Sequence, residues 1–167
     1  MIETARLTLV PATPTLLEAA LAGEDSLARA IGAALPADWP PEFIGEPAYR
    51  YTLDQLATAE QEGWWMYFVI ERGESPTVVG TGGYKGPPVD GTVEVGYAVV
   101  ESCQRRGIAT EATRGWIDRA FADPRVDRVI GETMPDRPAS IRVLEKLGFT
   151  ASSDASEEGV LRFERRA

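Results

Sequence analysis

A short basic turn, Gln104 to Thr110, combines the residue types that bind phosphate groups. Arg105 and Arg106 supply two positive charges, and Gly107 lets the backbone approach a ligand closely because it has no Cβ. The turn follows an apolar, strand-like run from Val93 to Val100 and opens a run with helical periodicity. The first amides of a helix have no partner within the helix, and the helix dipole adds partial positive charge there. This order of strand, glycine turn and helix predicts a cradle for a pyrophosphate.

Glu94 is the candidate general base. It lies in the apolar run just before the turn, where a carboxylate beside a cleft could have a raised pKa and accept a proton, directly or through water. The alternative is an outward-facing glutamate on a half-solvated strand, because alternation places Val93 and Val95 on the opposite face. The chain has no histidine, which excludes a Ser-His-Asp triad, a Cys-His dyad and histidine metal sites. We therefore expect no metal.

Composition predicts one domain, residues 1–167, with one sizeable core, since 44% of the residues are hydrophobic. No apolar run approaches the length of a membrane span, and the first residues lack the order of a signal peptide. The single cysteine, Cys103, requires no oxidising compartment, so we expect a cytoplasmic protein. A net charge of −9 disfavours nucleic acid as a partner. It is consistent with a cationic substrate or with solubility alone.

The pattern of periodicities predicts an α+β fold with a mostly antiparallel sheet. Strand-helix-strand units should lie on either side of Gly107. The expected strands are 6–10, 64–71, 78–84, 92–100, 125–133, 150–154 and 160–165, and the expected helices are 13–22, 25–34, 52–62, 108–121 and 136–147. Thr13 should cap the first helix, and Gly148 should end the last one with Phe149 folding back over it.

Four segments together resemble the GNAT acetyltransferases, and specifically their RimJ/RimL-like branch. Gln104 to Ala109 resembles the family's acyl-CoA signature, Q/R-x-x-G-x-G/A after a strand. The other three are Ala5 to Val10 (ARLTLV), Glu94 to Tyr97 (EVGY) and Ala139 to Phe149 (ASIRVLEKLGF). The resemblance is dense from about Val78 to Phe149 and thin between Pro11 and Gly63.

The resemblance implies a GNAT fold with six to seven strands and direct transfer of an acetyl group from acetyl-CoA to a primary amine. It implies Glu94 as the base and backbone groups near Val99 and Val100 as partners of the pantetheine arm and the oxyanion. Residues at the phosphates of acetyl-CoA would be Gln104, Arg105, Arg106, Gly107, Ile108, Ala109 and Thr110. Cys103 beside the arginines is expected to have no role in the reaction, since direct transfer needs no acyl-cysteine.

Ser140 is the second candidate catalytic residue. In the RimJ/RimL-like branch, a serine here lies near the thiol of CoA and assists the departing thiolate. Its alternative role is to satisfy the backbone at the helix start. Where the family has asparagine, this chain has Arg137, which could reach a phosphate of CoA or remain a solvated charge. Many GNAT proteins use a tyrosine deeper in this helix, near the position of Leu144, and that route is not offered here.

The segment from Pro36 to Phe43 should shape the acceptor pocket, because in the family it lies over the substrate cleft. Trp39 and Phe43 could form an aromatic wall, with Asp38 and Glu42 meeting an ammonium group. The alternative is a loop anchored on the core by its aromatic residues. The acceptor stays open between a protein N-terminus and a small amine, as does a non-catalytic CoA-binding module. A homodimer through the last hairpin edge is possible.

Overall fold

The structure is a computed structural model that describes residues 1–58, 63–154 and 156–167. Within these ranges, eight strands form one sheet in the order β1-β2-β3-β4-β5-β6-β8-β7. The strands are β1 (Ile2–Glu3), β2 (Leu7–Pro11), β3 (Met66–Glu71), β4 (Thr77–Tyr84), β5 (Thr92–Val99), β6 (Arg128–Thr133), β7 (Thr150–Ser152) and β8 (Leu161–Arg166). The helices are α1 (Pro14–Ala22), α2 (Glu24–Ile31), α3 (Glu46–Thr58), α4 (Ile108–Phe121) and α5 (Pro138–Lys146), with a short 3-10 helix at Glu101–Cys103.

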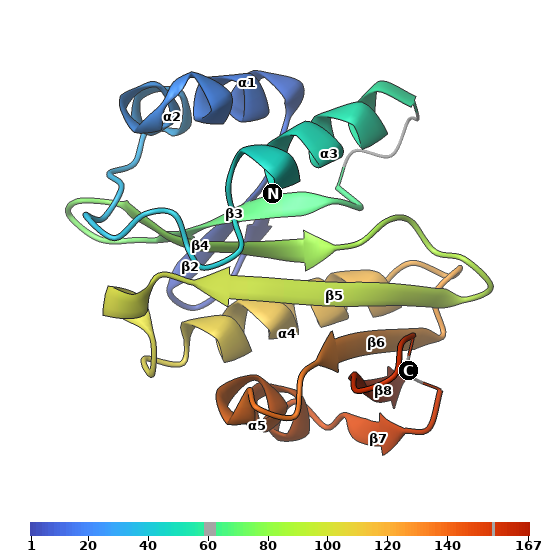
Figure 1. The fold of residues 1–167 in the computed structure, drawn as a ribbon. Helices are drawn as coiled ribbons and strands as arrows, with labels where there is room; N and C mark the ends of the chain where they lie inside the picture. The colour runs from blue at the N-terminus through green and yellow to red at the C-terminus, as the bar shows by residue number, and fades with distance from the viewer. Residues whose placement is uncertain (59–62, 155) are drawn as a thin grey trace.

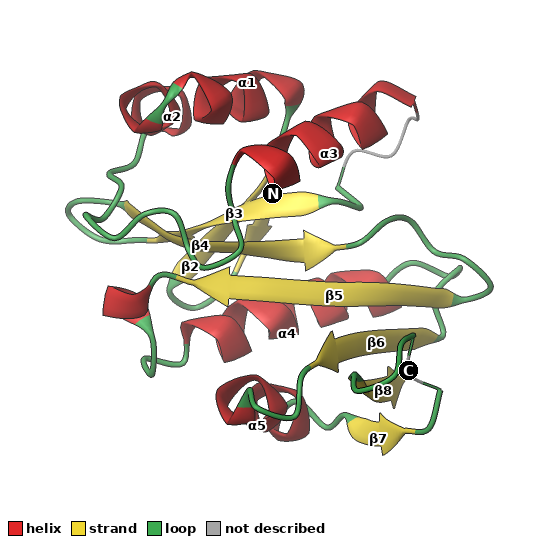
Figure 2. Ribbon diagram, in the orientation of Figure 1, coloured by secondary structure: helices red, strands yellow, loops and turns green. Residues whose placement is uncertain are grey.

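The helices cover both faces of the sheet. Figure 1 shows α1, α2 and α3 on one face, with α4 and α5 on the other, and Figure 2 shows the same layers by secondary structure. β5 and β6 pair in parallel, as the β5-α4-β6 crossover requires, and the other neighbouring strands pair antiparallel. Trp116 of α4 and Phe68 of β3 are fully buried in the core on the two sides of the sheet.

Local sequence signals explain several element boundaries. The Thr13 hydroxyl accepts a hydrogen bond from the amide of Leu16, so it caps α1 as predicted. The amide of Phe149 donates to the carbonyl of Leu144 at the end of α5, where Gly148 has a φ of 81°. Both the cap and this Schellman-type ending are confirmed.

Some predicted boundaries are wrong, and so is the predicted number of strands. α3 begins at Glu46, six residues before the predicted Thr52, because a proline in the first turn of a helix, here Pro47, lacks only an amide that has no partner anyway. The predicted end of that helix, 59–62, lies outside the described residues. β6 begins at Arg128 rather than Arg125, because a turn occupies the intervening positions. The sheet has eight strands rather than six to seven, since β1 is a two-residue strand.

Among the described residues, none of the helices combines the length and the apolar character needed to cross a membrane. The same part of the chain contains no group of three or more His, Cys, Asp or Glu side chains placed to hold a metal ion.

Candidate active site

The central feature of the site is an opening between β5 and β6. The two strands pair from Thr92 opposite Arg128 to Val95 opposite Gly131. β5 then continues to Val99 along β4 alone, so within the described residues its far edge has no strand partner beyond Val95. Backbone N–H and C=O groups on such an edge are free to pair with a ligand.

The backbone of β5 alternates between its two neighbours, which shows which groups face the opening. The amide of Lys85 donates to the carbonyl of Glu94, and the amide of Val100 donates to the carbonyl of Val79, so even-numbered residues face β4. Val99 faces the opening, and its carbonyl accepts a hydrogen bond from the Gln104 side chain at 3.1 Å. Of Val99 and Val100, only Val99 therefore has its backbone on the free edge.

The predicted phosphate cradle has the expected backbone form. Gly107 is the N-cap of α4 with φ 80° and ψ 5°, a left-handed conformation that favours glycine. Among the described residues, no side chain caps this helix, and Gly107 itself is exposed. The first amides of α4, from Ile108 to Thr110, thus point out of the helix toward solvent.

The two arginines of the turn behave differently. Arg106 makes two hydrogen bonds of 2.8 Å to the carboxylate of Glu71 at the end of β3. Arg105 is exposed and has a φ of 60°, which makes the turn tight. An anion at this turn would therefore meet mainly its backbone amides and Arg105, because Arg106 is already paired with Glu71.

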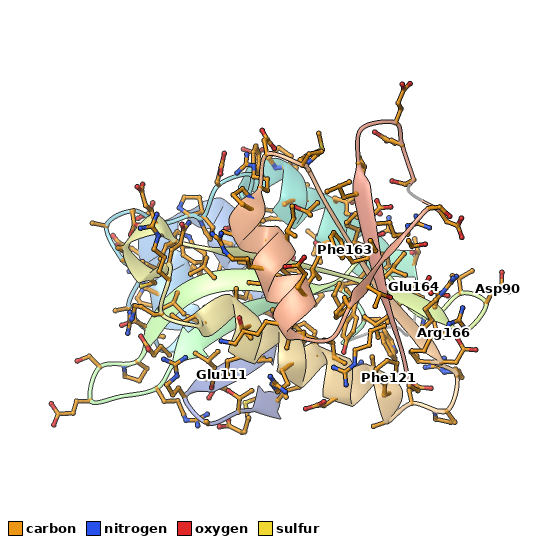
Figure 3. All side chains as sticks on the ribbon, turned by 90° about the horizontal axis from the view of Figure 1, so that it is seen from below. Asp90, Glu111, Phe121, Phe163, Glu164 and Arg166 are labelled. Atoms are coloured by element: carbon orange, nitrogen blue, oxygen red, sulfur yellow. The ribbon has the colours of Figure 1, made fainter. Side chains whose placement is uncertain are left out.

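A side-chain clamp that the sequence did not reveal holds the start of α4. Glu111, in the first turn, accepts hydrogen bonds from Thr4 Oγ1 at 2.6 Å and from Arg6 Nε at 2.8 Å. Arg6 also donates to the carbonyl of Arg106 at 3.1 Å, which ties the turn to the N-terminal strands. Figure 3 shows Glu111 lying beside those strands. Arg6 belongs to the recognised ARLTLV segment, but its partner lies 105 residues away.

Alternation along β5 separates two sets of side chains. Val95 lies beside Gly131 and near Leu144 of α5, so Val93, Val95 and Tyr97 face the α4–α5 side. Glu94, Gly96 and Ala98 face the side covered by α1, α2 and α3. The opening in the sheet therefore joins two chemically different faces.

Glu94 is largely buried, with its side chain 20% exposed, and forms an ion pair with the more exposed Lys85. Two residues further along the same face, Gly96 has open space above it, because a Cβ built there meets nothing within 4 Å. A carboxylate thus stands at the border of an unfilled part of the sheet surface. Glu94 lies on the face opposite Val93 and Val95, as strand alternation predicts, and its side chain is partly shielded from solvent.

Ser140 lies in the first turn of α5, where its amide donates to the carbonyl of Arg137 at 3.0 Å. The Tyr97 hydroxyl lies 3.1 Å from the Ser140 hydroxyl, where either group can donate, and also 3.1 Å from the Ser140 carbonyl oxygen, to which it can donate instead. The sequence offered Ser140 but not Tyr97, although strand alternation places Tyr97 on the side of α5. Leu144 is fully buried and lies beside Gly131 in the core.

Two polar contacts tie the loop from Pro36 to Gly45 to the segments that follow β5 and β6. The backbone amide and the hydroxyl of Ser102 each donate to Asp38 at 2.8 Å, and they hold the pKa of its carboxyl below the ordinary value. Arg137 makes two hydrogen bonds to the carboxylate of Glu42, at 2.8 and 3.2 Å, and lowers the pKa of that carboxyl. Pro36, Asp38 and Ser102 line a hollow of about 500 Å³ beside the end of β5.

The two aromatic residues predicted for the acceptor wall occupy different environments. Trp39 is buried, and its ring centroid lies 6.4 Å from that of Phe68, so it anchors the loop on the core. Phe43 is 80% exposed, with the guanidinium of Arg137 5.1 Å from its ring centroid. The structure brings Phe43 to the start of α5 and leaves Trp39 beneath the loop.

The chain is similar to known proteins of one family. The model of the acetyltransferase (GNAT) domain family matches residues 6–150. The chain is 28% identical over 159 residues to the uncharacterized N-acetyltransferase YjdG of Bacillus subtilis (strain 168), a match that covers 94% of each protein. These matches, together with those to solved structures, confirm the predicted GNAT fold.

Two solved structures with bound ligands are similar to the chain in fold. The Microcin C7 self immunity acetyltransferase MccE, in complex with acetyl-CoA and AMP, matches with a TM-score of 0.66 and 15% identity, over 98% of this chain and 93% of that chain. The ribosomal L7/L12 alpha-N-protein acetyltransferase RimL, in complex with coenzyme A, matches with a TM-score of 0.64 and 18% identity, over 98% and 95%.

Proposed function

The chain belongs to the GNAT acetyltransferase family, and from that premise we propose that it transfers the acetyl group of acetyl-CoA directly to a primary amine. The observation that carries the proposal is the separation of β5 from β6 after Val95. β5 carries Glu94 and leads into the Gly107 turn, and the Ser140 hydroxyl lies 3.1 Å from the hydroxyl of Tyr97 on the same strand. In the proposed reaction, the turn would hold the phosphates, Ser140 would donate to the leaving sulfur and Glu94 would be the base.

The residues fit acetyl-CoA as the co-substrate. The amides that open α4 would hold the pyrophosphate, since Gly107 adds no side chain and its φ of 80° directs the chain into the helix. The amide of Val99, whose carbonyl is already bonded to Gln104, would donate to the pantetheine arm or to the oxyanion. Acetyl-CoA supplies an activated thioester carbonyl.

In the proposed transfer, Glu94 takes up the proton on one face of β5, and Ser140 stabilises the leaving sulfur on the other. A bond forms between the amine nitrogen and the acetyl carbon while the carbon–sulfur bond breaks. The amine proton passes to the Glu94 carboxylate, directly or through water. The sulfur leaves as a thiolate, to which Ser140 donates a hydrogen bond.

The acceptor would enter from the α1–α3 side, over Gly96, where the sheet surface is open and Glu94 is near. The similar structures do not favour one acceptor class. RimL is named for a ribosomal protein, whereas the MccE complex contains AMP. We therefore propose a primary amine as the acceptor, on a protein N-terminus or on a small molecule, and a position in the RimJ/RimL-like branch.

The test combines binding with turnover. Calorimetry with acetyl-CoA comes first, and then release of the CoA thiol is followed with N-terminal peptides, polyamines, aminoglycosides and free amino acids. Release with one acceptor class, lost in Glu94→Gln, supports the proposal and identifies the class. Absence of acetyl-CoA binding would refute it. Binding without release for any acceptor would favour a non-catalytic CoA-binding module.

A further inference from the structure

Tyr97 and Ser140 meet at the α5 side of the opening. The Tyr97 hydroxyl lies 3.1 Å from both the hydroxyl and the carbonyl oxygen of Ser140. We propose that Tyr97 is a positioning residue that directs the hydrogen of the Ser140 hydroxyl toward the thiolate of CoA. This inference rests on the proposed function and deepens it by giving the leaving group a two-residue hydrogen-bond relay.

The number of available hydrogens determines what Tyr97 can do. A phenol has one hydrogen, a carbonyl oxygen can only accept, and a serine hydroxyl can donate and accept. When Tyr97 donates to the Ser140 carbonyl, the serine hydroxyl can donate back to Tyr97, which turns its hydrogen away from the opening. When Tyr97 donates to Ser140 Oγ, the serine hydrogen is free for the sulfur. Tyr97 thus sets the direction of the serine donor.

The surroundings keep Tyr97 in this role. It lies two residues beyond Val95, the last residue of β5 that pairs with β6, and its side chain points toward α5. Burial raises the pKa of its phenol, an effect that the hydrogen bond with Ser140 opposes only in part. Tyr97 therefore stays protonated near neutral pH and acts as a donor rather than as a base.

The relay strengthens the donor without removing a proton from serine. A serine in the first turns of a helix can instead turn its hydroxyl toward nearby backbone groups. A hydrogen bond from Tyr97 to Ser140 Oγ polarises the serine O–H group, because hydrogen bonds in a chain reinforce one another. The bond from Ser140 to a thiolate is then charge-assisted and favours the thiolate over the thiol. No proton leaves Ser140 or Tyr97.

The bound thiol itself reports on this relay, and no acceptor is needed. The pKa of the CoA thiol in the complex is measured from the ultraviolet absorbance of the thiolate, with the desulfo-CoA complex subtracting protein groups such as Cys103. In the wild type, we expect the bound thiol to have a pKa below that of free CoA. Tyr97→Phe should raise the pKa by about one unit, which is about tenfold less thiolate at a pH below the pKa. Ser140→Ala should raise it at least as much, and adding Tyr97→Phe to Ser140→Ala should change nothing further.

Tyr84→Phe is the matched control. Tyr84 lies on β4, the strand next to β5, and its buried hydroxyl donates to the carbonyl of Trp116 in α4 at 2.6 Å. The variant therefore loses a structural hydrogen bond away from Ser140. We expect it to keep the wild-type thiol pKa. The inference about Tyr97 would be overturned if Tyr97→Phe left the thiol pKa unchanged, or if it shifted the pKa equally in the wild type and in Ser140→Ala. The proposed function would survive either result. Failure of both CoA and desulfo-CoA to bind the wild type would overturn the proposed function and the inference with it.

Discussion

Two parts of the candidate site, the turn at Gly107 and the loop from Pro36 to Gly45, are built differently. The turn is contiguous, and its shape follows from one glycine at φ 80° and the helix that begins after it. The loop is held by side chains from distant segments: Asp38 bonds to Ser102, 64 residues away, and Glu42 bonds to Arg137, 95 residues away.

This difference matches what each region would bind. Phosphate groups can be held by backbone amides, which every residue except proline supplies, so the turn depends little on its side chains. The loop presents side chains, and any one of them can change without disturbing the helix start. The comparison predicts that cofactor binding is sensitive to backbone changes at the turn, whereas acceptor choice is sensitive to side chains on the α1–α3 face.

The largest effect is expected from Gly107→Glu. A side chain at this φ is strained, and a negative charge would stand where the phosphates bind. We expect the Kd for acetyl-CoA to rise by at least about a hundredfold, which corresponds to about 2.7 kcal/mol, while the fold survives. Calorimetry measures the affinity, and circular dichroism checks the fold.

Gly148→Glu is the control for backbone strain. Gly148 has a φ of 81° and open space where a Cβ would lie, but it ends α5 away from the turn. The strain should cost about 1–2 kcal/mol of stability at either glycine. Only the Gly107 variant should lose acetyl-CoA. Equal losses of affinity in the two variants would show that the turn has no special role.

The next largest effect is expected at Glu94, on the face of β5 that is covered by α1, α2 and α3. Glu94→Gln keeps the shape of the side chain but removes its capacity to accept a proton, so turnover should fall about tenfold or more at unchanged acetyl-CoA affinity. Lys85→Gln removes the partner of the ion pair and leaves the carboxylate in place. If turnover falls equally in both variants, the ion pair matters rather than the base.

The regions that could be predicted from sequence are those with local causes. The bounds of α4, the Thr13 cap and the ending of α5 at Gly148 follow from periodicity and from single capping residues. β1 could not be predicted, because two residues carry no periodicity. The start of α3 could have been found, since Pro47 after Glu46 is a typical first-turn proline.

In the candidate site, too, features with a local sequence signal could be predicted, and contacts between distant residues could not. The Gly107 turn and the strand that carries Glu94 were predicted because a motif and a strand pattern mark them. The contact between Tyr97 and Ser140 joins residues 43 positions apart, and it depends on which helix covers that face of β5. Strand alternation can place Tyr97 on the face of Val93 and Val95, but it cannot identify the partner of Tyr97. The pairing of Arg137 with Glu42 could not be predicted for the same reason, because the two residues are 95 positions apart and only the folded chain brings them together.

A smaller effect is expected at Gly96, where the acceptor would pass. Its backbone does not require glycine, and a Cβ there meets nothing within 4 Å, so Gly96→Ala and Gly96→Val should fold normally. Added methyl groups would occupy acceptor space, and Val should raise the acceptor KM by about tenfold, more than Ala does. Acetyl-CoA affinity serves as the internal control. A lower KM in the Val variant would place the acceptor elsewhere.

The smallest effect is expected at the ion pair between Glu42 and Arg137. Both side chains are exposed, so removing one should change the stability of the fold little. Glu42→Gln would release Arg137 for a phosphate of CoA, and acetyl-CoA affinity should rise a few fold, with a steeper dependence on salt.

Arg137→Gln tests the other half of the pair. It should lower acetyl-CoA affinity a few fold, and in its presence Glu42→Gln should have no further effect, because the two side chains act through one contact. Should Glu42→Gln instead weaken binding as Arg137→Gln does, the pair would shape the loop over the opening and not compete with the cofactor. The loop would then help the turn to hold acetyl-CoA, and the assignment of cofactor binding to the turn and acceptor choice to the loop would be wrong for this ion pair.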